Sequence, residues 1–544
     1  MPTIIIDGQS VTIPEGATLL EAARAAGIEI PTLCYREGLP AQTSCMVCVV
    51  RVDGAAKMVP SCATAVREGM VVESQSDEVL AARRMALELL LSDHLGDCLA
   101  PCQLACPAGM DIPRMIRAIV AGDVAAAVAI VQERIPLPTV LGRICPAPCE
   151  GACRRGSHDA PVSICLLKRW VGDEHLNAPE IWRPEMAPAS GKRVVIVGAG
   201  PAGLSATAFL HRMGHHVTLV DERGAPGGAL RQIPARTLPL AVLADEVATL
   251  LGADVEQRMD TRLGQDVQLD ELRASFDAVL LTVGAVEEAD AEQLGLPYGR
   301  RGLEADRITH ESPLTGVFIA GSAQSPSRMA VRAVAGGRGA ALAIDQHLRG
   351  AEIVPERRPF NVSRGRLTAE EAALMAEDAS DHGRIEPSWG AYAGFNDEEA
   401  TREGLRCLHC DCRALETCRL RKLSEELQAD PRKYATDRRR FTCDATHPAI
   451  IYEAGKCIAC GLCVEIARRY EEPLGLTFIG RGFDIRTAVP FGESLAEGLR
   501  RAAVECAEAC PTGALVVREQ AEEADEDEQQ RDEVADGPGP DQGV

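Results

Sequence analysis

The chain has 544 residues, a length that predicts three to five domains rather than one hydrophobic core. Its formal net charge of −23 disfavours a nucleic-acid partner, because a phosphate backbone needs a basic protein surface. We expect no membrane span, since no run of about eighteen apolar residues occurs. Residues 1–6 also lack the charged start of a signal peptide, so we expect a cytoplasmic protein.

The 21 cysteines determine which class of protein to expect. In a reducing compartment they indicate metal ligation rather than disulfides, and they occur in tight groups along the chain. The sequence therefore predicts a protein with several metal centres.

Residues 1–78 begin with the pattern of a small sheet. Residues 3–6 and 11–13 alternate around Asp7-Gly8, which predicts a hairpin. Thr18 and Glu21 have the spacing of a capping box, which predicts a helix through Ala26. Two strands, a helix and a following group of cysteines are the order of a β-grasp ferredoxin-like domain.

That group is Cys34, Cys45, Cys48 and Cys62. Four thiolates suit a 2Fe-2S cluster, although a zinc site is an alternative. With Pro31-Thr-Leu-Cys34-Tyr, this segment resembles the N-terminal domain of the large iron–sulfur subunit of complex I and of iron-only hydrogenases. The resemblance favours the 2Fe-2S cluster.

Residues 79–180 are predicted to be helical and to carry eight further ligands. Three residues separate each neighbouring pair in two series, followed by a later cysteine: His94, Cys98, Cys102, Cys106; Cys145, Cys149, Cys153; and Cys165. Eight ligands suit two 4Fe-4S clusters.

Two family resemblances meet in this helical segment. Residues 89–98 resemble the site with one His and three Cys of the complex I subunit, whereas residues 106–153 resemble the small subunit of NADPH-dependent glutamate synthase and dihydropyrimidine dehydrogenase. The second resemblance implies one cluster on Cys102, Cys153, Cys98 and His94, and another on Cys106, Cys145 and Cys149. That family has Glu or Gln near the position of Lys168, so we take Cys165 as the substitute fourth ligand.

Residues 190–350 follow a linker rich in Pro, Ala and Ser, and read as alternating strands and helices. Strand 193–197 leads into a glycine-rich turn, then a helix over 204–213 and a strand over 216–220 that ends at Asp221. Such a turn lets a pyrophosphate approach a helix N-terminus, and the acidic residue can bind ribose. The turn residues are Gly198, Gly200, Pro201, Ala202 and Gly203.

The expectation of FAD comes from resemblance to the glutamate synthase small subunit. Residues 226–234, with Gly228 and Arg231, and residues 316–326, with Gly321 and Ser322, resemble its flavin-binding segments. Ser322 replaces the usual Asp, as in flavin subunits of heterodisulfide reductases. That family inserts an NADPH domain between the segments matching Gly284 and Leu296, where this chain has only eleven residues. We therefore expect no pyridine-nucleotide site.

A connector over 351–400 leads to a second cysteine-rich region over 401–516, and an acidic, disordered tail is predicted over 517–544. Cys457, Cys460 and Cys463 predict a 4Fe-4S cluster with Cys510 as fourth ligand and Cys506 as competitor, an arrangement that resembles the complex I and hydrogenase subunits. A further 4Fe-4S cluster, or alternatively zinc, is predicted on Cys407, Cys410, Cys412 and Cys418. Cys443 and Cys506 are then expected to be free buried thiols.

The predicted fold is multidomain α/β and α+β: a β-grasp 2Fe-2S domain, a helical 4Fe-4S domain, a Rossmann-like FAD domain and a ferredoxin-like 4Fe-4S region. The predicted cofactors are FAD, one 2Fe-2S cluster and three to four 4Fe-4S clusters. We expect an electron-transfer subunit of a multisubunit oxidoreductase that needs its partner subunits. It would connect a partner that oxidises NAD(P)H, formate or hydrogen to ferredoxin or quinone.

Two other functions stay open at this point. One is a self-contained FAD-dependent oxidoreductase of the glutamate synthase small-subunit type, although no catalytic acid–base pair or nucleophile motif is recognisable. The other is a redox sensor or assembly scaffold, although no output domain is recognisable.

Overall fold

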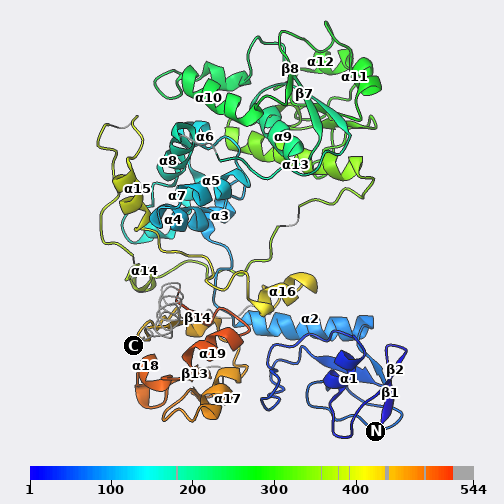
Figure 1. Cartoon of the computed structure of the whole chain (residues 1–544), viewed down its shortest axis with the longest axis vertical. Coiled ribbons are helices and arrows are strands. Elements are labelled where there is room, and N and C mark those ends of the chain that lie inside the picture. The colour runs from blue at the N-terminus through cyan, green and yellow to red at the C-terminus, as the bar shows by residue number, and fades with distance from the viewer. Residues whose placement is uncertain are drawn as a thin grey trace, which may run out of the picture. The chain divides into compact units, whose positions relative to one another are not determined.

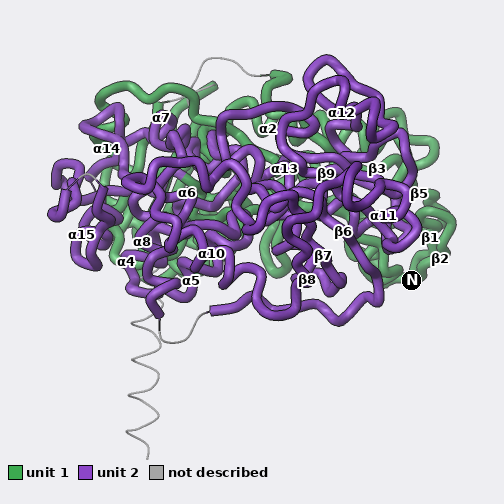
Figure 2. Tube along the Cα trace, turned by 90° about the horizontal axis from the view of Figure 1, so that it is seen from above, with its two compact units in different colours: residues 1–99, 359–374, 411–544 green, residues 100–358, 375–410 purple. Residues whose placement is uncertain are grey.

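A computed structural model describes residues 1–178, 182–356, 358–377, 379–390, 392–434, 440–482 and 485–518. The chain forms two compact units (Figure 2). Unit 1 comprises residues 1–99, 359–374 and 411–544, and unit 2 comprises residues 100–358 and 375–410. Unit 2 is thus inserted into the sequence of unit 1. The predicted acidic tail lies outside the described residues, apart from residues 517 and 518.

Unit 1 begins with a five-stranded mixed sheet (Figure 1). Its strands are β1 (Thr3–Ile6), β2 (Gln9–Thr12), β3 (Val49–Val52), β4 (Val59–Pro60) and β5 (Val71–Glu73), in the order β2-β1-β5-β3-β4. Only β1 and β5 pair in parallel. The predicted capping box is confirmed, because the side chains of Thr18 and Glu21 each accept from the other's backbone at the start of α1 (Leu19–Ala25). Helix α2 (Asp77–Ser92) follows the sheet.

The C-terminal part of unit 1 is built from short elements. Strand β11 (Ile450–Tyr452) pairs antiparallel with β14 (Leu515–Val517), and β12 (Thr477–Ile479) pairs antiparallel with β13 (Arg486–Ala488). The helices are α16 (Arg419–Glu426), α17 (Leu462–Arg469), α18 (Leu495–Gly498) and α19 (Ala503–Ala509). Ile450, Ile466 and Leu499 form part of the local core.

The helical part of unit 2 contains α3 (Pro101–Ala105), α4 (Ile112–Val120), α5 (Val124–Gln132), α6 (Pro138–Ile144), α7 (Pro148–Gly151), α8 (Ile164–Asn177) and α15 (Asp397–Gly404). Helices α6 and α8 cross closely because each has a glycine at the crossing. A Cβ at Gly142 would lie 2.5 Å from the Cα of Arg169, and one at Gly172 would lie 2.4 Å from the Oγ1 of Thr139. Helix α14 (Ala369–Ala376) spans the border between Leu374 and Met375, where the chain passes from unit 1 back to unit 2.

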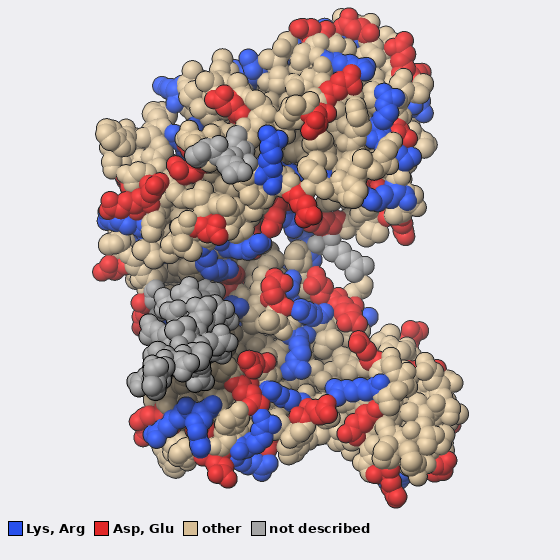
Figure 3. All heavy atoms as spheres, in the orientation of Figure 1, with Lys and Arg blue, Asp and Glu red and all other residues tan. Residues whose placement is uncertain are grey.

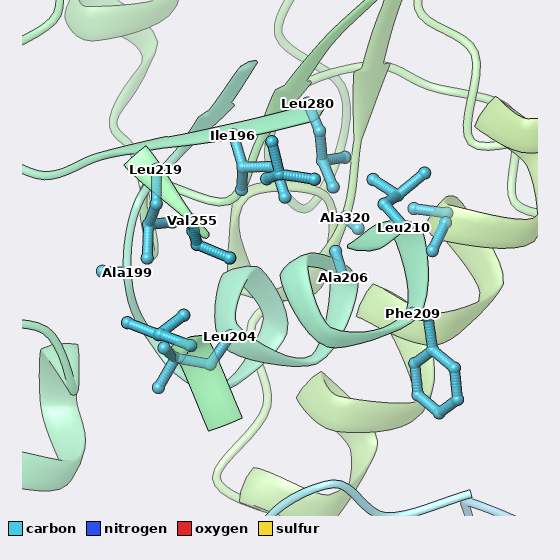
Figure 4. Close-up of a cluster of buried hydrophobic side chains, with 14 of the residues drawn as sticks. Ile196, Ala199, Leu204, Ala206, Phe209, Leu210, Leu219, Val255, Leu280 and Ala320 are labelled. Atoms are coloured by element: carbon cyan, nitrogen blue, oxygen red, sulfur yellow. The ribbon is translucent and has the colours of Figure 1, made fainter. Parts of the chain in front are cut away.

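The rest of unit 2 contains a parallel sheet in the order β10-β9-β6-β7-β8. Its strands are β6 (Arg193–Val197), β7 (His216–Val220), β8 (Glu256–Arg258), β9 (Ala278–Leu281) and β10 (Val317–Ile319), and its helices are α9 (Pro201–Arg212), α10 (Leu240–Leu251), α11 (Leu269–Ser275), α12 (Glu288–Gln293) and α13 (Ala330–Leu348). Both strands predicted around the glycine turn are confirmed. Buried side chains of the sheet pack against those of α9, including Ile196, Leu280 and Ala206 (Figure 4).

The borders of the units differ from the predicted domain borders. We expected a new domain at residue 79, but α2 belongs to unit 1, and the border follows Leu99. We expected another at residue 401, whereas the last of the unit borders lies between Cys410 and Asp411, after two others that follow Arg358 and Leu374. The first and the last of the four borders therefore fall inside cysteine-rich stretches, which local sequence patterns cannot divide.

Lys and Arg side chains are interspersed with Asp and Glu on the molecular face shown in Figure 3. Within the part of the chain that the structure describes, no helix is both long enough and apolar enough to cross a membrane.

Candidate functional site

The four cysteines of the β-grasp segment are buried as two pairs. The Sγ atoms of Cys48 and Cys62 lie 3.4 Å apart. A hydrogen bond from Cys45 lowers the pKa of Cys34 to about 5, and one from Cys62 lowers the pKa of Cys48 to about 6. One thiol of each pair therefore ionises easily, and two cysteine pairs suit the two irons of a 2Fe-2S cluster.

A second group in unit 1 joins residues from both sides of the inserted unit. The backbone N–H of Cys412 donates to the carbonyl of Cys98 at 3.1 Å. Burial raises the pKa of Cys98, and burial and the nearby thiols of Cys412 and Cys98 raise that of Cys418 to about 12. A thiol whose pKa is raised in this way gives up its proton when a metal binds to its sulfur, so three thiols so placed could hold an iron–sulfur cluster.

His94 is the candidate fourth member of this group. Burial lowers the pKa of His94 to about 4, so its imidazole is neutral, the form that binds metals. Among the described residues, its buried Nδ1 has no hydrogen-bond partner. Lys456 lies beside both His94 and Cys412, which places the imidazole in the same region as the thiols.

Residues of the predicted connector hold this group in place, a role that the sequence did not indicate. Asn361 Oδ1 accepts from the backbone N–H of Leu99 at 2.8 Å. The N–H of Arg364 donates to Asp97 Oδ1 at 3.0 Å, and its Nη2 donates to Glu453 Oε2 at 2.6 Å. Arg364 is buried, so these bonds fix the chain around Cys98.

A third group lies in unit 2, where Cys102, Cys153, Cys407 and Cys410 line one cavity. Burial, reinforced by the negative charge that the other three thiols can carry, raises the pKa of Cys102 well above its ordinary value. Four thiols around one cavity are a donor set that fits a 4Fe-4S cluster.

A buried ion-pair network brings residues 407–410 beside Cys153. Glu403 accepts from the backbone N–H of Ser163 and from Arg406 Nη1, both at 2.8 Å. Arg406 Nη2 also donates to Asp159 at 3.1 Å, and Arg155 donates to the carbonyl of Arg406 at 3.3 Å. Glu403 and Arg406 are fully buried, so the network fixes this approach of the chain.

The fourth group, also in unit 2, contains Cys106, Cys145, Cys149 and Cys165 around the side chain of Lys168. The hydrogen bond with Cys145 lowers the pKa of Cys165, but the bond with Cys149 and burial outweigh it and raise that pKa to about 11. Cys145 ends α6 and Cys165 lies in the first turn of α8, so the glycine crossing of these helices brings the two thiols together.

In the C-terminal group, Cys457, Cys460, Cys463 and Cys510 line one cavity. Cys506 is buried beside it, and its Sγ donates to the carbonyl of Cys463 at 3.5 Å. The geometry therefore favours Cys510 over Cys506 as the fourth ligand.

Two expected groupings differ from those in the structure. Cys102 and Cys153 were expected with Cys98 and His94, but the structure surrounds them with Cys407 and Cys410. Cys407, Cys410, Cys412 and Cys418 were expected as one site, but a unit border separates the first pair from the second. In the sequence, cysteines lie near both ends of unit 2. This feature could have predicted that cysteines from the two ends come together.

The four cysteines of the predicted 407–418 site are divided between two groups, so they do not form one centre of either kind by themselves. Within the described ranges, no three His, Cys, Asp or Glu side chains are placed to hold a single metal ion.

The glycine turn of unit 2 leaves open space where a nucleotide would approach. A Cβ at Gly198 would lie 2.4 Å from the carbonyl O of Thr282, and one at Gly203 would lie 1.8 Å from that of Gly198. A Cβ at Gly200 would meet nothing within 4 Å. Gly200 caps α9 without a side-chain hydrogen bond, and Pro201 and Ala202 begin the helix, so its first N–H groups can receive a phosphate.

The other predicted flavin residues surround this turn. Asp221 Oδ2 accepts from the N–H of Ala199 at 2.6 Å, so this carboxylate also supports the turn. A Cβ at Gly228 would lie 2.8 Å from the Cα of Gly200, and Arg231 donates to the carbonyl of Pro226 at 3.2 Å. Gly321 and Ser322 lie in a short 3-10 helix, where a Cβ at Gly321 would lie 2.8 Å from the Cβ of Ala202.

Glu246 of α10 connects the sheet domain to helix α6, which leads to Cys145. Its carboxylate accepts from the N–H groups of Thr139 and Val140 at 2.6 and 2.8 Å. Burial raises the pKa of Glu246 from 4.5 to about 7. The folded chain therefore holds this proton more tightly than the unfolded chain, and the associated stability, full below about pH 4.5, is lost as pH rises toward 7.

We expect Glu246→Gln to remove this pH dependence, because glutamine keeps an accepting oxygen but does not ionise. As pH rises from 4 to 8, the wild type loses the stability that comes from this proton and the variant does not. The free energy of unfolding of the variant, measured relative to that of the wild type, should therefore increase by about 3 kcal/mol over this range. Denaturant unfolding followed by tryptophan fluorescence measures this in unit 2, which contains Trp170, Trp182 and Trp389. A constant difference across this pH range would contradict the expectation.

Comparisons with known proteins match three segments of the chain. Residues 1–77 match a 2Fe-2S iron–sulfur cluster binding domain, and residues 95–179 match dihydropyrimidine dehydrogenase domain II with a 4Fe-4S cluster. Residues 156–338 match pyridine nucleotide-disulphide oxidoreductases. The chain therefore combines segments that are similar to 2Fe-2S, 4Fe-4S and pyridine nucleotide-disulphide oxidoreductase domains. The matches agree with the predicted classes of cofactor domain but do not identify individual ligands.

Three curated relatives share parts of the chain. The beta subunit of NADP(+)-dependent formate dehydrogenase from Moorella thermoacetica is 39% identical over 207 residues, covering 34% of this chain and 29% of its own. The NAD-dependent dihydropyrimidine dehydrogenase subunit PreT from Salmonella typhimurium is 35% identical over 38% of this chain and 52% of its own. The glutamate synthase [NADPH] small chain from Escherichia coli is 33% identical over 36% of this chain and 44% of its own.

The chain therefore spans about half or less of the length of these relatives. Among solved structures, an NAD+-reducing [NiFe]-hydrogenase aligns with 95% of this chain and 88% of its own at 13% identity and a TM-score of 0.29. Similarity at that level carries no argument about function.

Proposed function

We propose that this chain is the electron-transfer subunit of a larger oxidoreductase and relays electrons between one FAD and a series of iron–sulfur clusters. The observation that supports it most is the convergence of the cysteines into five separate groups in a chain that also carries a nucleotide-type turn. Two of the five groups join residues about three hundred positions apart in the sequence, and many of the thiols in the five groups are buried. That arrangement serves cofactor binding rather than core packing.

The proposed ligand sets follow from these groups. A 2Fe-2S cluster takes Cys34, Cys45, Cys48 and Cys62. Four 4Fe-4S clusters take His94, Cys98, Cys412 and Cys418; Cys102, Cys153, Cys407 and Cys410; Cys106, Cys145, Cys149 and Cys165; and Cys457, Cys460, Cys463 and Cys510. FAD lies over Gly198–Gly203, with Asp221, Gly228, Arg231, Gly321 and Ser322 around it.

A flavin exchanges electrons in pairs or singly and a cluster exchanges them singly, which is the chemistry that such groups supply when bound. The residues of this chain bury the clusters, exclude water from them and set their potentials through hydrogen bonds and charge. Cys418 and Cys510 lie in neighbouring groups, because Pro511, next to Cys510, accepts from the thiol of Cys418 at 3.8 Å. Adjacent groups of this kind suit a relay within unit 1.

Other subunits would supply the substrate chemistry. The relatives named above include subunits of a formate dehydrogenase and of a dihydropyrimidine dehydrogenase, so we propose a partner that oxidises formate, NAD(P)H or hydrogen and an acceptor such as ferredoxin or quinone. Residues 282–316 alone join β9 and β10, and they contain α12 and coil rather than a second nucleotide domain. A pyridine nucleotide would then bind to a partner.

The test is an anaerobic cofactor analysis of the purified chain, followed by titration with NADH and with NADPH. The proposal predicts about eighteen irons and one FAD per chain, with no flavin bleaching by either nucleotide until a partner subunit is added. Rapid bleaching of the chain alone would instead indicate a self-contained flavoenzyme. Redox-dependent binding of a target without turnover would indicate a sensor.

A further inference from the structure

The side chain of Lys168 is buried at the centre of the fourth cysteine group. It is 3% exposed, and its Nζ lies 3.9 Å from the Sγ of Cys165. Lys168 follows Cys165 by one helical turn of α8, so both side chains lie on one face of the helix. Cys145, Cys106 and Cys149 are its other ionisable neighbours.

No carboxylate in the described residues lies within ion-pair distance of Nζ. Glu150, which contacts the backbone of Cys165, is already committed: Oε1 accepts from the N–H of Cys165 at 3.0 Å, and Oε2 pairs with Arg384 at 2.9 Å. An isolated ammonium in such a position costs several kcal/mol, whereas one beside thiolates is stabilised. The surroundings of Lys168 therefore require negative charge on the sulfur atoms.

We propose that the ammonium of Lys168 is the built-in counter-charge of the iron–sulfur cluster held by Cys106, Cys145, Cys149 and Cys165, and that it raises the reduction potential of that cluster. This inference rests on the ligand set proposed above. The reduced cluster carries one more negative charge than the oxidised cluster, so a fixed positive charge beside it stabilises the reduced state. Because the Lys168 side chain is buried, water screens little of this attraction.

In this geometry Lys168 acts on the potential of the cluster and does not itself take part in a reaction. Its ammonium meets the cysteine sulfur atoms and not a substrate. With this charge, the fourth cluster has a higher reduction potential than it would have with four thiolates alone. Transfer of an electron to this cluster within the relay is therefore more favourable.

The test compares Lys168→Met, which keeps the length and removes the charge, with Lys168→Arg, which keeps the charge. Lys192→Met is the matched control, because Lys192 is a solvent-accessible lysine of the same unit. Iron per chain is measured first, and each cluster is then titrated by EPR against a series of solution potentials. Cys145→Ser identifies the signal of the fourth cluster by its disappearance.

With Lys168→Met we expect the reduced-to-oxidised ratio of that cluster to fall at least tenfold at a fixed potential, which is about 59 mV for one electron. Lys168→Arg and Lys192→Met should stay near wild type, and the other clusters should not move. If the cluster is lost in Lys168→Met and retained in Lys168→Arg, the cluster requires a positive charge at this position, which would also support the proposal. An unchanged potential in Lys168→Met, or loss of the cluster in both Lys168 variants, would overturn the proposal. If Cys145→Ser removes no signal and no iron, the ligand set itself is wrong.

Discussion

Replacing Cys407 with serine is expected to remove the same cluster as replacing Cys102 with serine. The two thiols line one cavity in unit 2, although about three hundred residues separate them in the sequence. Each variant should lose about four irons per chain, and the double variant should lose no more than either single variant. Cys412→Ser should remove a different cluster, so its combination with Cys407→Ser should lose about eight irons.

Anaerobic iron and sulfide determination, together with EPR of the reduced proteins, provides the measurement. Cys443→Ser is the control, since Cys443 belongs to none of the five proposed ligand sets. Additive losses for Cys102→Ser and Cys407→Ser would mean that the two residues serve different clusters. If the iron losses of Cys407→Ser and Cys412→Ser are not additive, the two residues serve one cluster, as cysteine spacing predicted.

Gly200→Val is expected to abolish FAD binding without disturbing the fold. A Cβ at Gly200 meets no protein atom within 4 Å, so the added side chain fills the space over the N-terminus of α9 where the pyrophosphate would lie. FAD affinity should fall at least a hundredfold, about 2.7 kcal/mol, while the iron content stays the same. Flavin released on denaturation and flavin fluorescence titration measure the effect.

Two other glycines provide the comparison. Gly383→Val should retain FAD, because a Cβ there also meets nothing within 4 Å and the residue lies away from the turn. Gly203→Ala should instead disrupt unit 2, since its Cβ would lie 1.8 Å from the carbonyl O of Gly198. Retention of FAD at wild-type affinity in Gly200→Val would show that the flavin does not bind over this turn.

Local sequence patterns predicted the regular elements around the nucleotide turn well. Strands β6 and β7 begin and end at the predicted residues, because a continuous apolar run next to glycine specifies a buried parallel strand. The capping box at Thr18 is equally local, since its donors and acceptors lie within one helical turn. Helix α9, however, starts at Pro201 rather than Leu204, because proline and glycine were counted with the turn.

The cofactor classes could also be predicted from short stretches of sequence. Cysteine type and spacing are chemical properties of such stretches, and the 2Fe-2S and 4Fe-4S domain matches agree with them. Cys34, Cys45 and Cys48 lie near enough along the chain for their spacing to group them. The same holds for Cys457, Cys460 and Cys463.

The grouping of distant cysteines, by contrast, depends on the tertiary structure. Cys98 and Cys412 lie on opposite sides of the inserted unit 2 in the sequence, and they come together because the flanking segments pack against each other within unit 1. Cys407 reaches Cys153 through the buried Glu403–Arg406 network, whose members look like ordinary surface charges in the sequence. The spacing of cysteines specifies a ligand set only where the segment between them is short, because a short segment keeps its two ends close together. Groupings of distant cysteines depend instead on packing and on buried charge.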